Sequence, residues 1–593
     1  MTLGQFEYSI DDDWVSASAT RNFLLRDPLV DWLARYGRTH KFMRDDEQPD
    51  YDERLEFAPF IMGRGIAFEA AIADYFRTLS PVLVITDDYR RIRDPEAARE
   101  TFAAMAAGHP VIHHGVLHDV QTRTYGAPDF LVRSDVLARF FPGGLPLNAP
   151  LASSPLLGGL YHYVVVDVKF TMLHLLVSGQ VGNGGSSSAY KGELFIYNRA
   201  LGNTQGYMPE TAFLLGRGWE QTSKGVTSRV DSAFDRLGQV VMDSVQGAGV
   251  DAAVEWVRRV RREGGDWEVL PAPTLPELYP NATVDSDFPW HGAKSIIAKE
   301  LDELTMLWQV GVDKRDAAVN KGITRWTDRR VTAELLGVTG ERTQPTLQAI
   351  IEVHQDASAP PILPAKVTVA EDEWRAVPSI EFFVDFETVS NLNDDMVNIP
   401  AQHGQPLIYM VGCGHVQNGD WTFRTFTTAT LTEDSEAEMI DAWLAHMDEV
   451  STAAGGEQPP RVIHWSAAEP SFYQTSYDSA RARHPRKSWP DLAWFDLLDR
   501  VFRAEPVVVR GSLGFGLKAV AKAAYGHGLI ETSWGESKVD GLGAMVGAWW
   551  CDHEARRQHV SMHEIDLMKE IEQYNEVDCK VMMELLYLLR ANH

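Results

Sequence analysis

The sequence predicts an α/β protein made of two mixed domains and a helical region between them. Three observations lead to this prediction. Strand-like and helix-like segments alternate in the first and last thirds, whereas residues 231–365 are mostly helical in pattern. Residues 357–364 are rich in proline, which cannot continue a helix, so they suit a linker. We therefore expect one domain at 1–230 and another at 366–593.

The composition indicates a folded chain and excludes several other classes. The 593 residues carry a formal net charge of −28, and 45% of them are hydrophobic, which excludes disorder as the main state. The 3 cysteines are too few for a disulfide scaffold or for a four-thiolate zinc or iron–sulfur site. The negative charge argues against a non-specific nucleic-acid coat. It allows a metal-dependent nuclease, because such enzymes gather carboxylates and cations at their sites.

The hydropathy pattern and the charge of the N-terminal segment indicate the cellular compartment of the protein. No run of about 18 apolar residues is present, so we expect no membrane span. The acidic start, with Asp11, Asp12 and Asp13, is the opposite of the basic start of a signal peptide. We therefore expect a cytoplasmic protein with reduced cysteines.

The first third combines helices with one strongly apolar strand. Residues 18–36 and 66–79 carry apolar side chains at helical spacing. Residues 161–170 are rich in valine and tyrosine, which predicts a buried central strand. A further helix is expected at 191–201.

Four motifs in this third carry side chains that suit metal-dependent phosphodiester hydrolysis. In order, they are Gly65-Ile-Ala-Phe-Glu69, Gly126-Ala-Pro-Asp129, Asp167-Val-Lys169 and Glu193-Leu-Phe-Ile-Tyr197. Asp167 and Lys169 are two residues apart on a strand, so both side chains leave the same face. Asp129 and Asp167 can then share Mg²⁺ or Mn²⁺, because such ions take a few carboxylates together with water and substrate phosphate.

Two further residues complete this first expected site. Lys169 can orient or activate the attacking water, or stabilise charge in the transition state. Glu69 can hold a water or a second ion from its helix. For Asp167 and Lys169 alone, the alternative is an ion pair at the end of a strand.

The order of the four motifs resembles that of the PD-(D/E)XK nucleases, specifically their RecB-like branch. The segment Trp14-Val-Ser-Ala-Ser18 is similar to the start of that branch. The resemblance implies a restriction-endonuclease-like domain whose catalytic residues are Glu69, Asp129, Asp167, Lys169, Glu193 and Tyr197. Iron–sulfur members carry a cysteine where this chain has Asp27-Pro28, so we expect no cluster. Glu193 stands where the branch usually has glutamine.

Two segments of the middle region suit contacts with phosphates. Arg258, Arg259, Arg261 and Arg262 form a basic helix face, for which the alternative is a solvated surface. Residues 304–311 and 320–328 resemble a degenerate helix–hairpin–helix, a module that binds the phosphate backbone through amides at helix N-termini. A role in packing alone is the alternative.

The last third contains a second set of carboxylates. Strands are expected at 380–386, 407–413 and 461–465, and helices dominate the tail. The first strand ends in Asp385-Phe-Glu387, and the third leads into His464-Trp-Ser-Ala-Ala-Glu469. Tyr574-Asn-Glu-Val-Asp578 places a tyrosine and a carboxylate on one helix face. A bound cation would keep such neighbouring carboxylates ionised.

These motifs resemble the DEDD 3′→5′ exonucleases of the RNase H-like fold, in their tyrosine-containing form. The resemblance implies that Asp385, Glu387, Glu469 and Asp578 bind two metal ions and that Tyr574 positions the water. Glu469 departs from the family pattern, which has aspartate there, and Asp496 is a rival for its role. The segment 511–518 lacks the Gly-Lys-(Ser/Thr) of a phosphate-binding loop and fits a connector.

The whole layout resembles predicted bacterial and phage RecB-family nucleases with a C-terminal RNase H-like domain. We therefore expect a hydrolase that cleaves nucleic acid, DNA in preference to RNA, with Mg²⁺ or Mn²⁺. No ATPase motif is present, so a helicase or other partner would supply any unwinding. The alternatives are an RNA exonuclease, a single-activity nuclease whose RNase H-like domain only binds strands, and a non-catalytic acidic scaffold.

Overall fold

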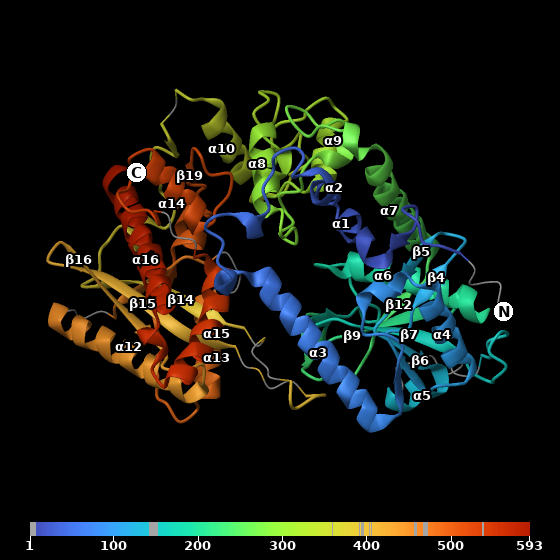
Figure 1. Cartoon of the computed structure of the whole chain (residues 1–593). Coiled ribbons are helices and arrows are strands. Elements are labelled where there is room, and N and C mark those ends of the chain that lie inside the picture. The colour runs from blue at the N-terminus through green and yellow to red at the C-terminus, as the bar shows by residue number, and fades with distance from the viewer. Residues whose placement is uncertain are drawn as a thin grey trace. The chain divides into compact units, whose positions relative to one another are not determined.

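The chain divides into two compact units, each of which is mixed α/β. The computed structural model describes residues 8–141, 152–358, 360–390, 392, 396–401, 404, 406–455, 459–466, 472–535 and 539–593. The first unit consists of Met1–Pro49, Ile61–Glu300 and Asp394–His403, and the second of Asp50–Phe60, Leu301–Asn393 and Gly404–His593 (Figure 1). The expected helical middle is thus divided between the units at Glu300, and the boundary expected near 365 lies inside the second unit.

The first unit is built on a six-stranded sheet in the order β12-β9-β7-β6-β3-β2. Its strands are β2 (Val82–Val84), β3 (Val111–His113), β6 (Phe130–Arg133), β7 (Tyr163–Val168), β9 (Thr211–Leu215) and β12 (Gly238–Val241). β3, β6 and β7 are antiparallel neighbours, and β9 is parallel to β7. All of β7 is buried, which confirms the central strand that the sequence predicts there.

Two helices cover the faces of this sheet. The even-numbered residues of β7 contribute Val164 and Val166 to a core that also contains Phe68 and Phe76 of α3. α6 packs against β7 and β9, and Asp167 lies among the odd-numbered residues of the opposite face. α3 (Phe57–Leu79) and α6 (Ser187–Gln205) both extend beyond the helices expected from the sequence.

The remaining elements of the first unit are shorter or lie outside the main sheet. They are β1 (Val15–Ser16), β4 (Leu117–Asp119), β5 (Thr124–Gly126), β8 (Met172–His174), β10 (Gly218–Ser223), β11 (Val226–Val230), α1 (Arg21–Leu24), α2 (Leu29–Tyr36), α4 (Pro95–Ala106), α5 (Ser134–Phe140), α7 (Ser244–Glu263) and α8 (His291–Leu301). The helix expected at 18–36 is broken, because Arg26 has a φ of 62° and Pro28 cannot continue the preceding helix.

Charged side chains from the middle region bind residues near the N-terminus through ion pairs and hydrogen bonds. Lys294 Nζ lies 2.8 Å from Asp27 Oδ2 and 2.5 Å from Asp287 Oδ2, and all three side chains are buried. Asp27 therefore has a structural role as the partner of Lys294. Arg258 donates to the carbonyl of Asp13 at 2.9 Å. Arg261 donates to that of Trp14 at 2.8 Å.

The second unit contains a five-stranded sheet in the order β16-β15-β14-β17-β18. Its strands are β14 (Glu381–Val389), β15 (Leu407–Gln417), β16 (Asp420–Thr427), β17 (Arg461–His464) and β18 (Ala493–Asp496). β14, β15 and β16 are antiparallel neighbours, whereas β17 is parallel to β14 and β18 is parallel to β17. The three strands expected in this region are therefore confirmed.

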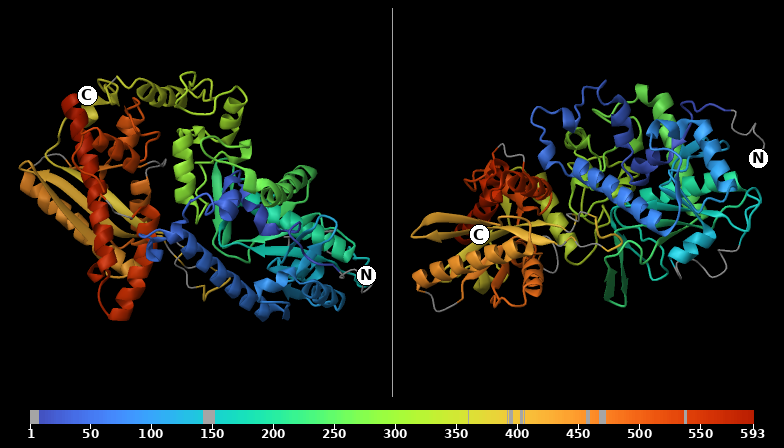
Figure 2. Two further views of the ribbon diagram at one scale, coloured as in Figure 1. Left: turned by 45° about the horizontal axis from the view of Figure 1, so that its top comes forward. Right: turned by 60° about the horizontal axis from the view of Figure 1, so that its bottom comes forward.

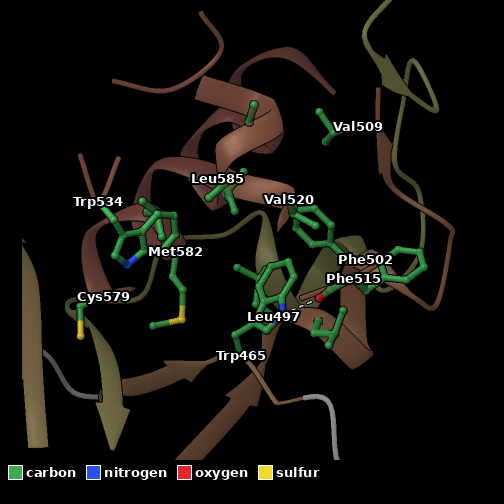
Figure 3. Close-up of a cluster of buried hydrophobic side chains, with 14 of the residues drawn as sticks. Trp465, Leu497, Phe502, Val509, Phe515, Val520, Trp534, Cys579, Met582 and Leu585 are labelled. Atoms are coloured by element: carbon green, nitrogen blue, oxygen red, sulfur yellow. Dashed lines mark hydrogen bonds between the residues drawn. The ribbon is translucent and has the colours of Figure 1, made fainter. Parts of the chain in front are cut away.

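Helices cover both faces of this sheet. α12 (Glu433–Ala454) follows one face, where Trp443 packs with Phe382 and Val384, and α16 (Asp566–Asn592) packs against β14 and β15 on the other (Figure 2). Figure 3 shows the core on the α16 side, in which the Trp465 indole N–H donates to the carbonyl of Phe515 at 3.0 Å. The other helices are α9 (Val312–Val319), α10 (Thr343–Gln355), α11 (Glu371–Trp374), α13 (Phe472–Arg483), α14 (Leu517–Gly526) and α15 (Gly541–Gln558).

Two expectations about the middle region are corrected. Residues 320–328 form turns and irregular structure, so the second helix of a helix–hairpin–helix is not formed there. Leu304 and Ile323 are instead buried in the core of the second unit, which favours the packing role. The proline-rich segment contains β13 (Ile362–Leu363), which pairs with β19 (Val508–Val509). Within the described residues, no helix has the length and apolar character that crossing a membrane needs.

Two candidate metal centres

The first candidate centre lies where β7 ends. The amide of Val168 donates to Asp129 Oδ2 at 2.6 Å, and the amide of Asp129 approaches Asp167 Oδ1 at 3.5 Å. Lys169 Nζ lies 2.7 Å from Asp167 Oδ2 and 2.9 Å from Glu193 Oε2. The structure therefore brings together four of the residues that the sequence predicts for this site.

Burial and neighbouring charges both shift the pKa values of the residues in this centre. Burial raises the pKa of Asp129 well above its usual range, and the nearby charges of Asp167 and Glu69 raise it further. Burial alone would lower the pKa of Lys169, but Asp167 and Glu193 outweigh it and the pKa is raised. Lys169 is therefore held as a cation. Glu193, which replaces the expected glutamine, supplies part of that stabilisation.

Tyr197 has a packing role beside this centre. Its ring lies so close to Gly126 that a Cβ at Gly126 would be 2.4 Å from a ring carbon of Tyr197. Glycine in the Gly126-Ala-Pro-Asp129 motif is therefore required by the approach of α6 to β5. Tyr197 is buried, and burial raises the pKa of its hydroxyl, which keeps the hydroxyl protonated.

Glu69 joins two histidines that the sequence analysis did not single out. Among the described residues, the potential ligand atoms that converge on Glu69 belong to His113 and His114 rather than to Asp129 and Asp167. Burial would raise the pKa of Glu69, but hydrogen bonds with both imidazoles outweigh it and lower the pKa to about 2. The adjacent His-His pair at a strand end was the available sequence signal.

The second candidate centre lies between β14 and α16. Asp385, Glu387 and Asp578 have ligand atoms that all lie within 4.8 Å of one another. Asp385 and Glu387 are on the face of β14 that also bears Phe383, which packs in the core with α16. Asp578 projects from α16, one helical turn after Tyr574. The structure thus brings together three of the four metal ligands predicted for this centre.

Neighbouring side chains hold two of these carboxylates in place. The Tyr473 hydroxyl donates to Asp385 Oδ1, and Asn575 Nδ2 donates to Asp385 Oδ2 at 2.8 Å. The Trp534 indole N–H donates to Asp578 Oδ1 at 3.0 Å. Tyr473, Asn575 and Trp534 were not predicted, because their contacts depend on tertiary structure.

Burial dominates the protonation of this carboxylate group. It raises the pKa of Asp385 to about 6, although the hydrogen bond from Tyr473 acts against the shift. The pKa of Glu387 is raised well above its usual range by burial and by the charges of Asp385 and Asp578. Burial and the charge of Asp385 raise the pKa of Asp578 as well. A bound cation would favour the ionised forms of all three.

Tyr574 and Lys518 lie beside the carboxylates. Lys518 Nζ is 5.1 Å from the centroid of the Tyr574 ring and 5.8 Å from that of the Trp534 ring. Burial lowers the pKa of Lys518, whereas Asp578 acts in the opposite direction. The sequence predicted only a connector at Lys518, whereas the structure shows a cation next to the carboxylate group.

The sequence offers two candidates for the fourth metal ligand of this centre, Glu469 and Asp496. Glu469 lies outside the described residues. Asp496 accepts hydrogen bonds from the amides of Leu498 and Asp499 at 3.0 and 3.2 Å, so its carboxylate caps the turn after β18. It does not join the group formed by Asp385, Glu387 and Asp578.

Comparison of the chain with family models, with curated proteins and with solved structures gave no match.

Proposed function

We propose that this chain is a metal-dependent nuclease with two sites, acting on DNA in preference to RNA. The observation that carries the proposal is the convergence of Asp385, Glu387 and Asp578 within 4.8 Å. Three carboxylates this close repel one another when ionised, so a buried group of this kind is suited to divalent cations. The preference for DNA follows from the RecB-like motif order.

The architecture of the second unit supports an exonuclease of the DEDD type. A strand order of β16-β15-β14-β17-β18, in which β15 runs opposite to the other four strands, fits an RNase H-like domain. Two of the proposed ligands lie on the central strand β14 and the third on the last helix. This is the placement that the sequence resemblance implies.

The architecture of the first unit supports a PD-(D/E)XK site. The helix α3, the antiparallel strands β3, β6 and β7, the helix α6 and the parallel strand β9 occur in this order along the chain, with shorter elements between them. This order fits a restriction-endonuclease-like domain. Asp167 and Lys169 lie at the end of the central strand, and Glu193 faces them from α6.

At the second site, Asp385, Glu387 and Asp578 would hold two Mg²⁺ or Mn²⁺ ions. Bound there, such ions would supply activation of a water and stabilisation of the leaving oxygen of a phosphodiester. Asn575 and Trp534 fix the orientation of two of the carboxylates by donating hydrogen bonds to them. Tyr574 would position the attacking water for removal of the 3′-terminal nucleotide.

At the first site, Asp129 and Asp167 would hold the ion, and Lys169 would stabilise negative charge on the phosphate. Lys169 is fixed between Asp167 and Glu193, which keep it protonated. A cation that retains its proton suits charge stabilisation better than removal of a proton from water. Of the two roles expected for Lys169, we therefore favour electrostatic stabilisation.

Digestion of 5′-labelled single-stranded DNA with Mn²⁺ tests the second site. The wild type and Asp167→Asn should shorten the strand progressively from its 3′ end, whereas Asp385→Asn should not. Asp566→Asn is a matched control, because Asp566 is an exposed carboxylate on the same helix as Asp578. Degradation by Asp385→Asn at the wild-type rate and polarity would exclude this site as the exonuclease.

A matched RNA strand in the same assay tests the substrate class. Faster degradation of RNA than of DNA would replace the DNA preference by an RNA exonuclease. Cleavage of neither polymer would favour the non-catalytic scaffold.

A further inference from the structure

The group formed by Glu69, His113 and His114 has a donor set unlike that of the carboxylate groups. Its two imidazoles and one carboxylate offer ligand atoms that all lie within 4.8 Å of one another. Imidazole nitrogens bind borderline transition metals such as Zn²⁺ well, whereas Mg²⁺ prefers oxygen ligands. The donor set therefore points to a different class of ion from Mg²⁺.

The backbone places both histidine rings on the same side. Successive side chains on a strand normally point to opposite faces. β3 ends at His113, and His114 has a φ of 51°, in the left-handed region that side chains other than glycine rarely adopt. The two rings therefore stack, with centroids 3.9 Å apart and 24° between their planes.

The same nitrogen of each ring approaches Glu69. Glu69 Oε1 lies 2.6 Å from Nε2 of His114 and 3.2 Å from Nε2 of His113. His114 Nδ1 lies 3.1 Å from the carbonyl oxygen of Thr86. Because a carbonyl oxygen only accepts hydrogen bonds, Nδ1 carries the hydrogen, and Nε2 offers its lone pair when the ring is neutral. A backbone carbonyl at the far nitrogen is the usual support of a metal-binding histidine.

His113 is a buried polar side chain directed at the same point. It is 6% exposed, and its ring stacks on Phe130 with centroids 4.8 Å apart. Its Nδ1 has no hydrogen-bond partner among the described residues, which leaves Nε2 as the polar contact of the ring. Burying an imidazole with so few partners is unfavourable unless another interaction compensates.

We propose that Glu69, His113 and His114 form a binding site for a divalent transition metal ion, of which Zn²⁺ is the best-fitting class. The three side chains would supply two nitrogens and one carboxylate oxygen, and water or substrate would complete the coordination. The site adjoins the first nuclease site, because the amide of His114 donates to the carbonyl of Asp129 at 3.0 Å. Metal binding here does not depend on the proposed nuclease activity.

Titration of the full chain with Co²⁺, followed by displacement with Zn²⁺, tests the proposal. Nitrogen ligation should intensify the visible absorption of one equivalent of Co²⁺, and Zn²⁺ should abolish that signal. His113→Asn and His114→Asn should each weaken the affinity at least tenfold. His174→Asn is the matched control, because the exposed His174 pairs with the carboxylate of Glu220 in the same unit. Unchanged binding in both cluster variants would overturn the proposal.

A second measurement covers variants that fail to fold. X-ray absorption of the Zn²⁺-loaded wild type should show scattering from two imidazoles, and its absence would also overturn the proposal. Asp167→Asn and Asp385→Asn should leave the Co²⁺ signal in place. Because the readout is metal binding, it separates failure of this site from failure of the proposed nuclease function.

Discussion

Lys518 lies beside the carboxylates of the second site, and we expect it to bind the phosphate backbone of the substrate there. Its ammonium lies 5.1 Å from the Tyr574 ring and interacts with the charge of Asp578. We predict that Lys518→Met weakens the binding of the phosphate backbone, raising KM for single-stranded DNA by about tenfold with a smaller change in kcat. Steady-state degradation rates measure this. Lys522→Met, an exposed lysine on the same helix, is the control, and equal values in the two variants would contradict the role.

The protonation of Asp385 predicts how metal binding at the second site depends on pH. Its pKa is raised to about 6, and those of Glu387 and Asp578 are raised further. A metal ion must displace these protons, so the affinity should fall as the pH decreases through 6, with a limiting slope of about tenfold per pH unit for each proton displaced. Mn²⁺ titrations of Asp167→Asn between pH 5 and 8 measure the slope. A pH-independent affinity would show that these carboxylates are not the ligands.

Individual residues also show where sequence reasoning succeeds. Asp385 and Glu387 alternate on a strand, and Tyr574 and Asp578 are one helical turn apart, so local periodicity was sufficient to place each pair on one face. Tyr473, Asn575 and Trp534 hold those carboxylates from positions that only the fold brings near. His113 and His114 meet Glu69 across 44 and 45 positions in the sequence, and no local spacing indicates such a contact.

At the scale of elements, the close approach of β15 to α16 supports the second site. A Cβ at Gly412 would lie 1.7 Å from Asn575 Oδ1, and Asn575 donates to Asp385. We predict that Gly412→Ala displaces Asn575 and lowers Mn²⁺ affinity at the second site by about tenfold, the value of one misplaced hydrogen bond to a charged group. Calorimetric titration measures it. Gly526→Ala, which meets open space on α14, should leave the affinity unchanged.

The buried ion pairs of Lys294 connect α8 to the segment before α2, and we expect them to contribute strongly to the stability of the first unit. Lys294 Nζ contacts both Asp27 and Asp287, and all three side chains are buried. Replacement by methionine leaves the buried Asp27 without its cation and Asp287 with His291 as its remaining partner, so we predict a loss of about 3–5 kcal/mol in the free energy of unfolding. Urea denaturation measures it. A loss below about 1 kcal/mol, as expected for the exposed Lys299→Ala, would contradict this account.

Elements were predicted best where their pattern is local and strong. The buried, valine-rich β7 and the largely apolar β14 were expected within a few residues of their bounds. The segment 18–36 is helical as expected but interrupted, because Arg26 adopts a positive φ ahead of Pro28. The hairpin helix at 320–328 was wrong, because Ile323 is buried in the second unit without helical structure. Local backbone conformation decided the first case, and tertiary packing decided the second.

At the scale of the whole molecule, the chain consists of two compact units, each with a mixed sheet and its own candidate centre. The proline-rich segment suggested a boundary near 365, but Ile362 and Leu363 pair with β19 inside the second unit. Composition could not show this, because the pairing partner lies about 145 residues further along the chain, at Val508 and Val509. The division supports two sites that can be inactivated separately.

The most direct test of two metal-dependent sites is a comparison of wild type, Asp167→Asn, Asp385→Asn and the double variant on linear duplex and single-stranded DNA with Mn²⁺. We predict that each single variant loses one pattern of products and keeps the other, with the 3′-end ladder lost in Asp385→Asn. The double variant should be inactive. Wild-type cleavage by the double variant would contradict the assignment of both centres.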